Sequence, residues 1–398
     1  MNPDLAKLQP YPFEKLRELK AGTQPPADRE HIALSIGEPK HNPPGFVADT
    51  LISHMHGLAN YPVTKGAPEL REAITDWLIQ RFDLGVDSVD AERHVLPVSG
   101  TREALFSFAQ AVVDRTRDPL VLIPNPFYQI YEGAAYLAGA EPRFINLTAD
   151  NGFLPELDTI AATEWERIQL VYVNSPGNPT GAVMEEADYQ RLIELSDRYG
   201  FVIASDECYS EIYLDEDDAP AGLLGACARM GRDDFRNCVV FHSLSKRSNL
   251  PGLRSGFVAG DAEVIDRYRL YRTYHGCTLA PPTQAGSAAA WADEEHVRAN
   301  RDAYREKFDA VLDVLGDVLE VERPRAAFYL WPRTPIPDTD FARRLFDEQN
   351  VTVLPGSFLS REAEGINPGA NRVRMALVAP LEECVEAACR IRRLVESL

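Results

Sequence analysis

The central part of the chain alternates short apolar runs with longer segments in which apolar residues recur every three or four positions. Strands that are apolar at every position are typical of parallel sheets covered by helices on both faces. The longer segments predict amphipathic helices, as in residues 101–116, where Leu105, Phe108 and Val112 lie on one helical stripe. We therefore expect an α/β fold whose sheet contains strands at residues 120–126, 168–176, 201–207 and 238–245.

The pattern changes after about residue 285. A long, charged helical stretch is predicted up to about Leu319, then short apolar runs and a last helix from Glu382. This mixture predicts a smaller α+β domain, and the lack of a Gly/Ser-rich linker favours a helix as the connection. We expect a large domain over residues 46–284 and a small domain formed by both chain ends, residues 1–45 and 285–398.

An excess of acidic residues narrows the range of partners. The chain has 398 residues, with 61 Asp and Glu against 41 Lys and Arg, for a formal charge of −20. This balance argues against non-specific binding to nucleic acid or to anionic membranes, and no apolar run is long enough to span a bilayer. The first residues, up to Lys20, are mixed and charged, unlike a signal peptide.

The cysteines and histidines predict no metal site. The 6 cysteines form no CxxC pair, and the 8 histidines form no HExxH motif. Thiols in this arrangement are typical of reduced, mostly buried cysteines in a cytoplasmic protein. The composition therefore predicts a cytoplasmic protein and is ordinary for a soluble globular enzyme.

Polar clusters follow several of the predicted strands. Residues 99–101 connect a strand to a helix, residues 174–181 form a turn, Asp206 ends a strand, and Lys246 and Arg254 follow another. Ligands of parallel sheets bind beyond the carboxyl ends of the strands. Backbone N–H groups at a helix start, as at residues 99–101, suit a phosphate.

Each cluster alone has an ordinary interpretation: a helix cap, a common turn, or a solvated lysine. Together they suit a ligand that combines a phosphate, a polar ring and an electrophilic carbonyl. Pyridoxal 5′-phosphate (PLP) has all three features, and it requires a lysine for its carbonyl and an acid for its pyridine nitrogen. The sequence therefore predicts a PLP site around Asp206 and Lys246.

The same blocks, in this order, resemble the fold-type I PLP-dependent aminotransferases of class I/II. The resemblance covers nearly the whole chain, from "LSIGEP" at 34–39 through "YPVTKGAPELREAI" at 61–74 to "RVRMAL" at 372–377. It implies a large domain with a mostly parallel, seven-stranded sheet between helices, and a smaller α+β domain. It also implies amino-acid and 2-oxo-acid substrates.

The resemblance gives roles to residues around the cofactor ring. Lys246 matches the lysine that forms the Schiff base and carries the proton, and Asp206 matches the acid that keeps the pyridine nitrogen protonated. Asn178 and Tyr209 match the pair that contacts the phenolic oxygen of the ring. Tyr128 matches the aromatic residue that stacks on the ring face.

The phosphate and the partner subunit are assigned in the same way. The expected phosphate donors are hydroxyls, a guanidinium and amides near the start of a helix, from Gly100, Thr101, Arg102, Ser243, Ser245 and Arg254. Tyr61 matches a tyrosine that such enzymes lend to the phosphate site of the partner subunit. The resemblance thus implies a homodimer with active sites shared across the interface.

The resemblance also implies residues that bind the substrate. Arg374 matches the arginine that binds the α-carboxylate, but Arg372 lies two residues away, so the choice stays open. Gly37 matches a backbone position that closes over this carboxylate. The commoner family pattern "GEPDF" is replaced here by "GEPKH", with Lys40 and His41. Further basic residues depart from or flank the family motifs, namely Lys65 and Arg247.

Lys40, Lys65 and Arg247 together predict extra positive charge at the mouth of the cleft and a substrate with several carboxylates. The strings around residues 243–261 and 274–291 are most similar to bacterial N-succinyldiaminopimelate aminotransferases. This similarity implies amino transfer between N-succinyl-LL-2,6-diaminopimelate and 2-oxoglutarate in lysine and diaminopimelate biosynthesis. N-acetylornithine, aspartate or aromatic aminotransferases and a carbon–sulfur lyase stay open as alternatives. A transcription regulator is disfavoured by the negative charge and the few residues before "SIGEP".

Overall fold

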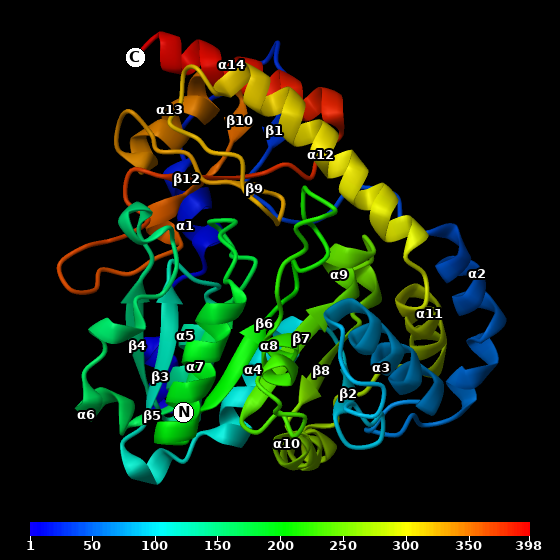
Figure 1. Cartoon of the computed structure of the whole chain (residues 1–398). Coiled ribbons are helices and arrows are strands. Elements are labelled where there is room, and N and C mark those ends of the chain that lie inside the picture. The colour runs from blue at the N-terminus through cyan, green and yellow to red at the C-terminus, as the bar shows by residue number, and fades with distance from the viewer.

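A seven-stranded sheet forms the centre of the computed structural model, which describes residues 1–398 (Figure 1). The strand order is β2-β8-β7-β6-β5-β3-β4. Only β8 runs antiparallel to its neighbours β2 and β7; the other pairs are parallel. The strands are β2 (Val95–Val98), β3 (Leu120–Asn125), β4 (Glu141–Asn146), β5 (Ile168–Asn174), β6 (Val202–Asp206), β7 (Cys238–Ser243) and β8 (Gly256–Gly260).

The predicted strands are confirmed as β3, β5, β6 and β7, and the predicted α/β fold is confirmed with them. The sequence pattern did not single out β4 and β8. β4 has only one buried residue, Ile145, because it is an edge strand that pairs with β3 alone, so it lacks the wholly apolar pattern. β8 follows β7 after residues 244–255, which contain α9, and pairs antiparallel with it, with Ser243 opposite Gly256.

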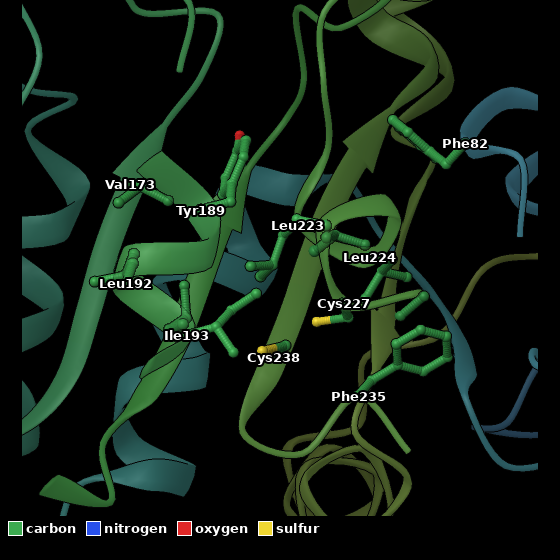
Figure 2. Close-up of a cluster of buried hydrophobic side chains, with 14 of the residues drawn as sticks. Phe82, Val173, Tyr189, Leu192, Ile193, Leu223, Leu224, Cys227, Phe235 and Cys238 are labelled. Atoms are coloured by element: carbon green, nitrogen blue, oxygen red, sulfur yellow. The ribbon is translucent and has the colours of Figure 1, made fainter. Parts of the chain in front are cut away.

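Successive strand residues point to opposite faces of the sheet, and each face has its own hydrophobic core. Cys238 and Val240 pack in one core and Val239 packs in the other. The first core contains helices α3, α7, α8 and α11; the second contains α4, α5 and α10. Figure 2 shows part of the first core, where Leu192 of α7 and Leu224 of α8 approach the sheet. Both faces are therefore covered, as the apolar strands predict.

The helices of this part of the molecule connect consecutive strands or cover the sheet (Figure 1). They are α2 (Gly45–Ser53), α3 (Pro68–Phe82), α4 (Thr101–Val112), α5 (Ile130–Ala138), α6 (Ala162–Trp165), α7 (Glu186–Tyr199), α8 (Leu223–Arg229), α9 (Leu244–Arg247), α10 (Ala262–His275) and α11 (Pro281–Trp291). None of the helices in the molecule is both apolar enough and long enough to cross a bilayer.

Both chain ends contribute to a second group of elements. β1 (Ile32–Ala33) pairs in parallel with β10 (Val351–Thr352), so the N-terminal segment joins the C-terminal one. A three-stranded sheet has the order β11-β12-β9. The remaining elements are α1 (Pro12–Leu19), α12 (Glu295–Leu315), β9 (Tyr329–Leu330), α13 (Asp338–Gln349), β11 (Leu354–Pro355), β12 (Val373–Ala376) and α14 (Leu381–Glu396).

The predicted continuous helix up to Leu319 is interrupted. The structure has two helices there, α11 and α12, separated by residues 292–294. The predicted domain boundary at residue 284 falls inside α11, which packs against α2 and α3 on the large sheet. The division into 46–284 and the two chain ends stays a prediction, and the packing favours a boundary after α11.

Candidate active site

A cleft of about 580 Å³ lies at the carboxyl ends of β5, β6 and β7, beside the start of α4. Segments from both chain ends complete its wall. Most of the predicted site residues line this cleft, namely Gly37, Thr101, Arg102, Tyr128, Asn178, Asp206, Tyr209, Ser243, Ser245, Lys246, Arg254 and Arg374. The fold thus brings together residues that are far apart in the sequence, because the carboxyl ends of parallel strands share one edge.

Lys246 lies in the short helix α9, one turn after the end of β7. Ser243 caps this helix, with its Oγ accepting a hydrogen bond of 3.1 Å from the Ser245 N–H. The Lys246 ammonium donates a 2.7 Å hydrogen bond to the Gly37 carbonyl oxygen. Burial lowers the pKa of Lys246 to about 8, and the positive charge of Arg374 acts in the same direction. An amine with this pKa is about half neutral, and so nucleophilic, near pH 8, far below the ordinary range of lysine.

Asp206 is a buried carboxylate, 4% exposed, at the end of β6. It forms no ion pair within the chain; instead Tyr131 donates a hydrogen bond of 2.6 Å to Oδ2, and the Cys208 N–H lies 3.3 Å from Oδ1. Burial raises the pKa of Asp206. Because an unpaired buried carboxylate is costly, this position suits a cationic partner such as a protonated pyridine nitrogen.

Arg374 points into the cleft from β12. Its guanidinium donates to Asn178 Oδ1 at 2.9 Å and to the Ser35 carbonyl oxygen at 2.6 Å, and its buried Nε–H has no partner. No carboxylate pairs with it within the chain. Tyr209 and Tyr329 lie beside it, with their hydroxyl oxygens 2.9 Å apart. A buried arginine with free donors is well suited to a substrate carboxylate.

The other end of the cleft collects donors for a phosphate. Thr101 is the first residue of α4, and Gly100 precedes it with a positive φ of 89°. A Cβ atom on Gly100 would lie 2.3 Å from Arg254 Nη2, so only glycine leaves room for this guanidinium. Ser243 and Ser245 line the same end. The positive end of the helix, the hydroxyls and Arg254 together fit a phosphate.

The prediction that Arg247 faces the cleft is wrong. Its side chain is buried, 1% exposed, and points the opposite way to that of Lys246, into the core between α9 and α11. The guanidinium donates to the carbonyl oxygens of Ala290 and Asp293 and pairs with Glu294. It thereby satisfies carbonyl groups that are left without helical partners where α11 ends.

The structure places the two arginines near β12 in different grooves. β12 starts at Val373, so Arg372 lies outside the regular strand and does not line the main cleft. Arg372 donates to the Trp331 carbonyl oxygen at 2.8 Å and lies 4.9 Å above the ring of Phe153, in a different groove. The prediction of Arg372 as an α-carboxylate ligand is therefore not supported, and Arg374 is the candidate.

The remaining predicted residues lie outside the cleft of their own chain. Lys40 is exposed and does not line it. Lys65 pairs with Glu92 on the surface of the large domain. Tyr61 is fully exposed, at 101%, so its role towards a partner subunit stays a prediction. The predicted group of three cations at the cleft mouth is not present within one chain.

Several cleft residues were not predicted from the sequence. Asn174 ends β5, and its side chain donates to the Asp206 carbonyl oxygen at 2.9 Å and accepts from the Asn178 N–H at 2.8 Å. Tyr131, near the start of α5, was not predicted either; it is buried behind the cleft wall and reaches the site through its hydrogen bond to Asp206. Tyr11 and Glu38 could not, because no local pattern places the N-terminal segment over the sheet.

Comparison with known proteins agrees with this site. Residues 29–391 match the family model of the class I and II aminotransferases. An LL-diaminopimelate aminotransferase of Desulforudis audaxviator is 32% identical over 98% of this chain and 96% of that protein. An aminotransferase of Neisseria meningitidis shares 48% identity and a TM-score of 0.95, over 99% of this chain and 100% of that one.

A probable N-succinyldiaminopimelate aminotransferase of Thermus thermophilus has a TM-score of 0.81 and 28% identity, over 96% of this chain and 99% of that one. The family match spans nearly the whole chain and includes every residue of the cleft from Ile36 to Arg374. The buried Asp206, the lysine with a lowered pKa and the phosphate donors fit the cofactor of this family. The chain belongs to the class I and II aminotransferases, which use pyridoxal 5′-phosphate.

Proposed function

We propose that this aminotransferase acts on N-succinyl-LL-2,6-diaminopimelate, with 2-oxoglutarate as the amino acceptor. The products are N-succinyl-2-amino-6-oxopimelate and glutamate, and the reaction belongs to lysine and diaminopimelate biosynthesis in the cytoplasm. The names of the relatives from Desulforudis audaxviator and Thermus thermophilus support a diaminopimelate skeleton. The closeness in sequence to N-succinyldiaminopimelate aminotransferases around residues 243–261 supports the succinylated form.

The residues of the cleft divide the chemistry among them. When bound, PLP supplies the carbonyl that accepts the amino group and the ring that delocalises negative charge. Arg374 would orient the α-carboxylate. The Lys246 amine, with its pKa of about 8, would take a proton from the substrate α-carbon and return it to the cofactor side. Asp206 would keep the pyridine nitrogen protonated.

The observation that carries the substrate proposal is the position of Arg102 in the cleft, without a carboxylate partner. Its guanidinium lines the cleft, has no carboxylate partner, and donates to the Tyr11 hydroxyl at 2.7 Å. The guanidinium lies 5.2 Å from the ring of Tyr11 and 5.9 Å from that of Tyr128. The sequence predicts Arg102 among the cofactor ligands, and the structure places its guanidinium beside Tyr11 and Tyr128. A long substrate with a distal carboxylate would reach this guanidinium.

Free LL-2,6-diaminopimelate is a second candidate, favoured by one observation. Glu38 lines the same cleft and has no basic partner within the chain. A free distal ammonium group would pair with this carboxylate, whereas a succinylated nitrogen is neutral. The two substrates therefore differ in whether Glu38 is used.

The test compares kcat/KM with 2-oxoglutarate for succinyldiaminopimelate, free diaminopimelate, acetylornithine, aspartate and phenylalanine. The proposal predicts the highest value for the succinylated substrate; a higher value for free diaminopimelate would favour the second candidate. Preference for aspartate or phenylalanine would contradict both, and release of ammonia would indicate a lyase. Arg102→Ala should lower kcat/KM for the preferred diaminopimelate substrate about ten- to a hundredfold, and Arg102→Lys should lower it less.

We also propose a homodimer as the active unit. Exposed large apolar side chains gather on two stretches, Ile52–Val63 and Leu270–Tyr274. Thr278, four residues after the second stretch, donates a hydrogen bond of 3.1 Å from its hydroxyl to the carbonyl oxygen of Val63 in the first stretch. This contact brings the two stretches near one another. Apolar residues of this size on one face favour a subunit interface. Sedimentation should give twice the monomer mass, and Tyr61→Phe should weaken PLP binding without changing the mass; a monomer would contradict the proposal.

A further inference from the structure

His41, one of the residues that departs from the usual family motif, makes two hydrogen bonds away from the cleft. Its Nδ1 lies 2.7 Å from Asn300 Oδ1, and its Nε2 lies 2.6 Å from the Lys307 ammonium nitrogen. Both partners belong to α12, the long helix that runs beside α14 towards α11 (Figure 1). His41 also packs against the ring of Tyr304, at 4.6 Å between centroids.

The directions of these hydrogen bonds follow from the two groups at the ends of the chain, one of which can only donate and the other only accept. The Lys307 ammonium can only donate, so His41 Nε2 must accept. At the other end, Asn300 Nδ2 lies 3.4 Å from the Lys246 carbonyl oxygen, which can only accept. Asn300 Oδ1 therefore faces His41 and accepts a proton from Nδ1, while Asn249 Nδ2 donates to the same oxygen at 3.0 Å. His41 must be neutral and carry its proton on Nδ1.

Lys307 has no acidic partner, although it is buried and only 3% exposed. Its contacts are His41, the Val378 carbonyl oxygen at 3.4 Å and the ring of Tyr304 at 5.2 Å. A buried ammonium group without a carboxylate requires strong acceptors. A phenylalanine at this position, as in the pattern "GEPDF", would offer no nitrogen to accept this hydrogen bond. Burial and the positive charge of Lys307 both lower the pKa of His41, which agrees with a neutral ring.

This chain of hydrogen bonds reaches both ends of the catalytic lysine. Asn300 contacts the backbone carbonyl of Lys246. At the other end of this lysine, Nζ donates a 2.7 Å hydrogen bond to the carbonyl oxygen of Gly37, which lies four residues before His41. Lys307 extends the chain to Val378, just beyond the strand that carries Arg374. The chain therefore connects the lysine, the segment that covers the cleft and the strand of the substrate arginine.

We propose that Lys307, His41 and Asn300 form a positioning relay that holds Lys246 and the segment of Gly37 in the geometry needed to meet the cofactor carbonyl. The relay acts through hydrogen bonds to the lysine backbone and to the covering segment, so none of its members touches the cofactor. It does not depend on which amino acid is the substrate.

The first test is nitrogen NMR of the imidazole of His41 in the full-length protein without cofactor. The relay predicts a neutral ring with the proton on Nδ1. A charged ring, or a proton on Nε2, would overturn the relay, because Lys307 could not then donate to it. His31 provides a reference signal: it bonds to Thr352 through Nε2 at 2.8 Å and has no connection to Lys246.

The second test measures how fast the protein without cofactor takes up PLP, from the growth of its visible absorbance. His41→Phe keeps an aromatic ring against Tyr304 and should lower this rate about tenfold. His31→Phe is the matched control and should not change it. Equal rates in the two variants would overturn the proposal.

A double variant separates positioning from stability. His41→Phe strands the Lys307 ammonium, so adding Lys307→Met should restore much of the melting temperature. If the proposal holds, PLP uptake stays slow in this double variant, since Asn300 still lacks its donor. Recovery of the uptake rate together with the melting temperature would mean that His41 only stabilises the fold, and would overturn the proposal. If His41→Phe does not fold, the PLP uptake rate of the double variant is compared directly with that of the unaltered protein.

Discussion

Tyr131 donates a 2.6 Å hydrogen bond to Asp206 Oδ2, and its ring stacks on that of Tyr172 at 4.6 Å between centroids. The hydroxyl of Tyr172 is used elsewhere, on the Leu105 carbonyl oxygen at 2.7 Å. One tyrosine of this stacked pair therefore orients the carboxylate of the active site, while the other only anchors the stack. The pair offers a variant and a matched control in the same core.

Tyr131→Phe should lower kcat about tenfold, because a hydrogen bond to a charged group contributes about 1.5–3 kcal/mol. The hydroxyl lowers the pKa of Asp206 against the effect of burial, so its removal raises that pKa further and weakens the hold on the pyridine nitrogen. The measurement is kcat together with the pH dependence of the visible absorbance of bound PLP. Tyr172→Phe should leave both unchanged; equal behaviour of the two variants would contradict this role of Tyr131.

Asp206→Asn should retain PLP but lower amino transfer by about a hundredfold or more, because a neutral amide cannot keep the pyridine nitrogen protonated. Cofactor content and single-turnover rates measure the two effects separately. Asp261 is a suitable control, since it is also buried, 8% exposed, but caps α10 away from the cleft. Near-normal turnover of a PLP-loaded Asp206→Asn variant would count against the assignment.

The lowered pKa of Lys246 predicts a pH dependence of PLP uptake. Only the neutral amine attacks a carbonyl, and with a pKa of about 8 its fraction increases as the pH rises towards 8 and is nearly complete above it. The uptake rate should therefore rise about tenfold per pH unit well below pH 8 and level off above. Arg374→Met should move the midpoint upwards, because Arg374 lowers this pKa. A midpoint near 10.5, the ordinary value for lysine, would show that burial does not act on this amine.

The sequence predicts best those residues that follow buried strands. Asp206 and Lys246 could be placed at one edge of the sheet, because wholly apolar runs identify the parallel strands and their order along the chain. The choice between Arg372 and Arg374 stayed open because no local pattern marks where β12 begins. Its first residue, Val373, is determined by pairing with β11 and β9, which lie elsewhere in the sequence.

Long-range partners account for the residues that were misplaced. Arg247 follows Lys246 in sequence, yet its partners lie between Ala290 and Glu294. Lys65 is paired with Glu92, and neither contact leaves a local signature. A charged residue next to a catalytic one is thus weak evidence for a role in the site, because adjacent side chains of a helix point in different directions.

The identity of the cofactor lysine is the central claim, and it can be tested directly. Borohydride reduction of the PLP-loaded enzyme makes the bond between the cofactor and its lysine permanent, and mass spectrometry of the peptides then locates it. The structure predicts a single modified site at Lys246, whose amine lies in the cleft with Asp206, Arg254 and Arg374. Modification of another lysine, with Lys246 unmodified, would contradict the account.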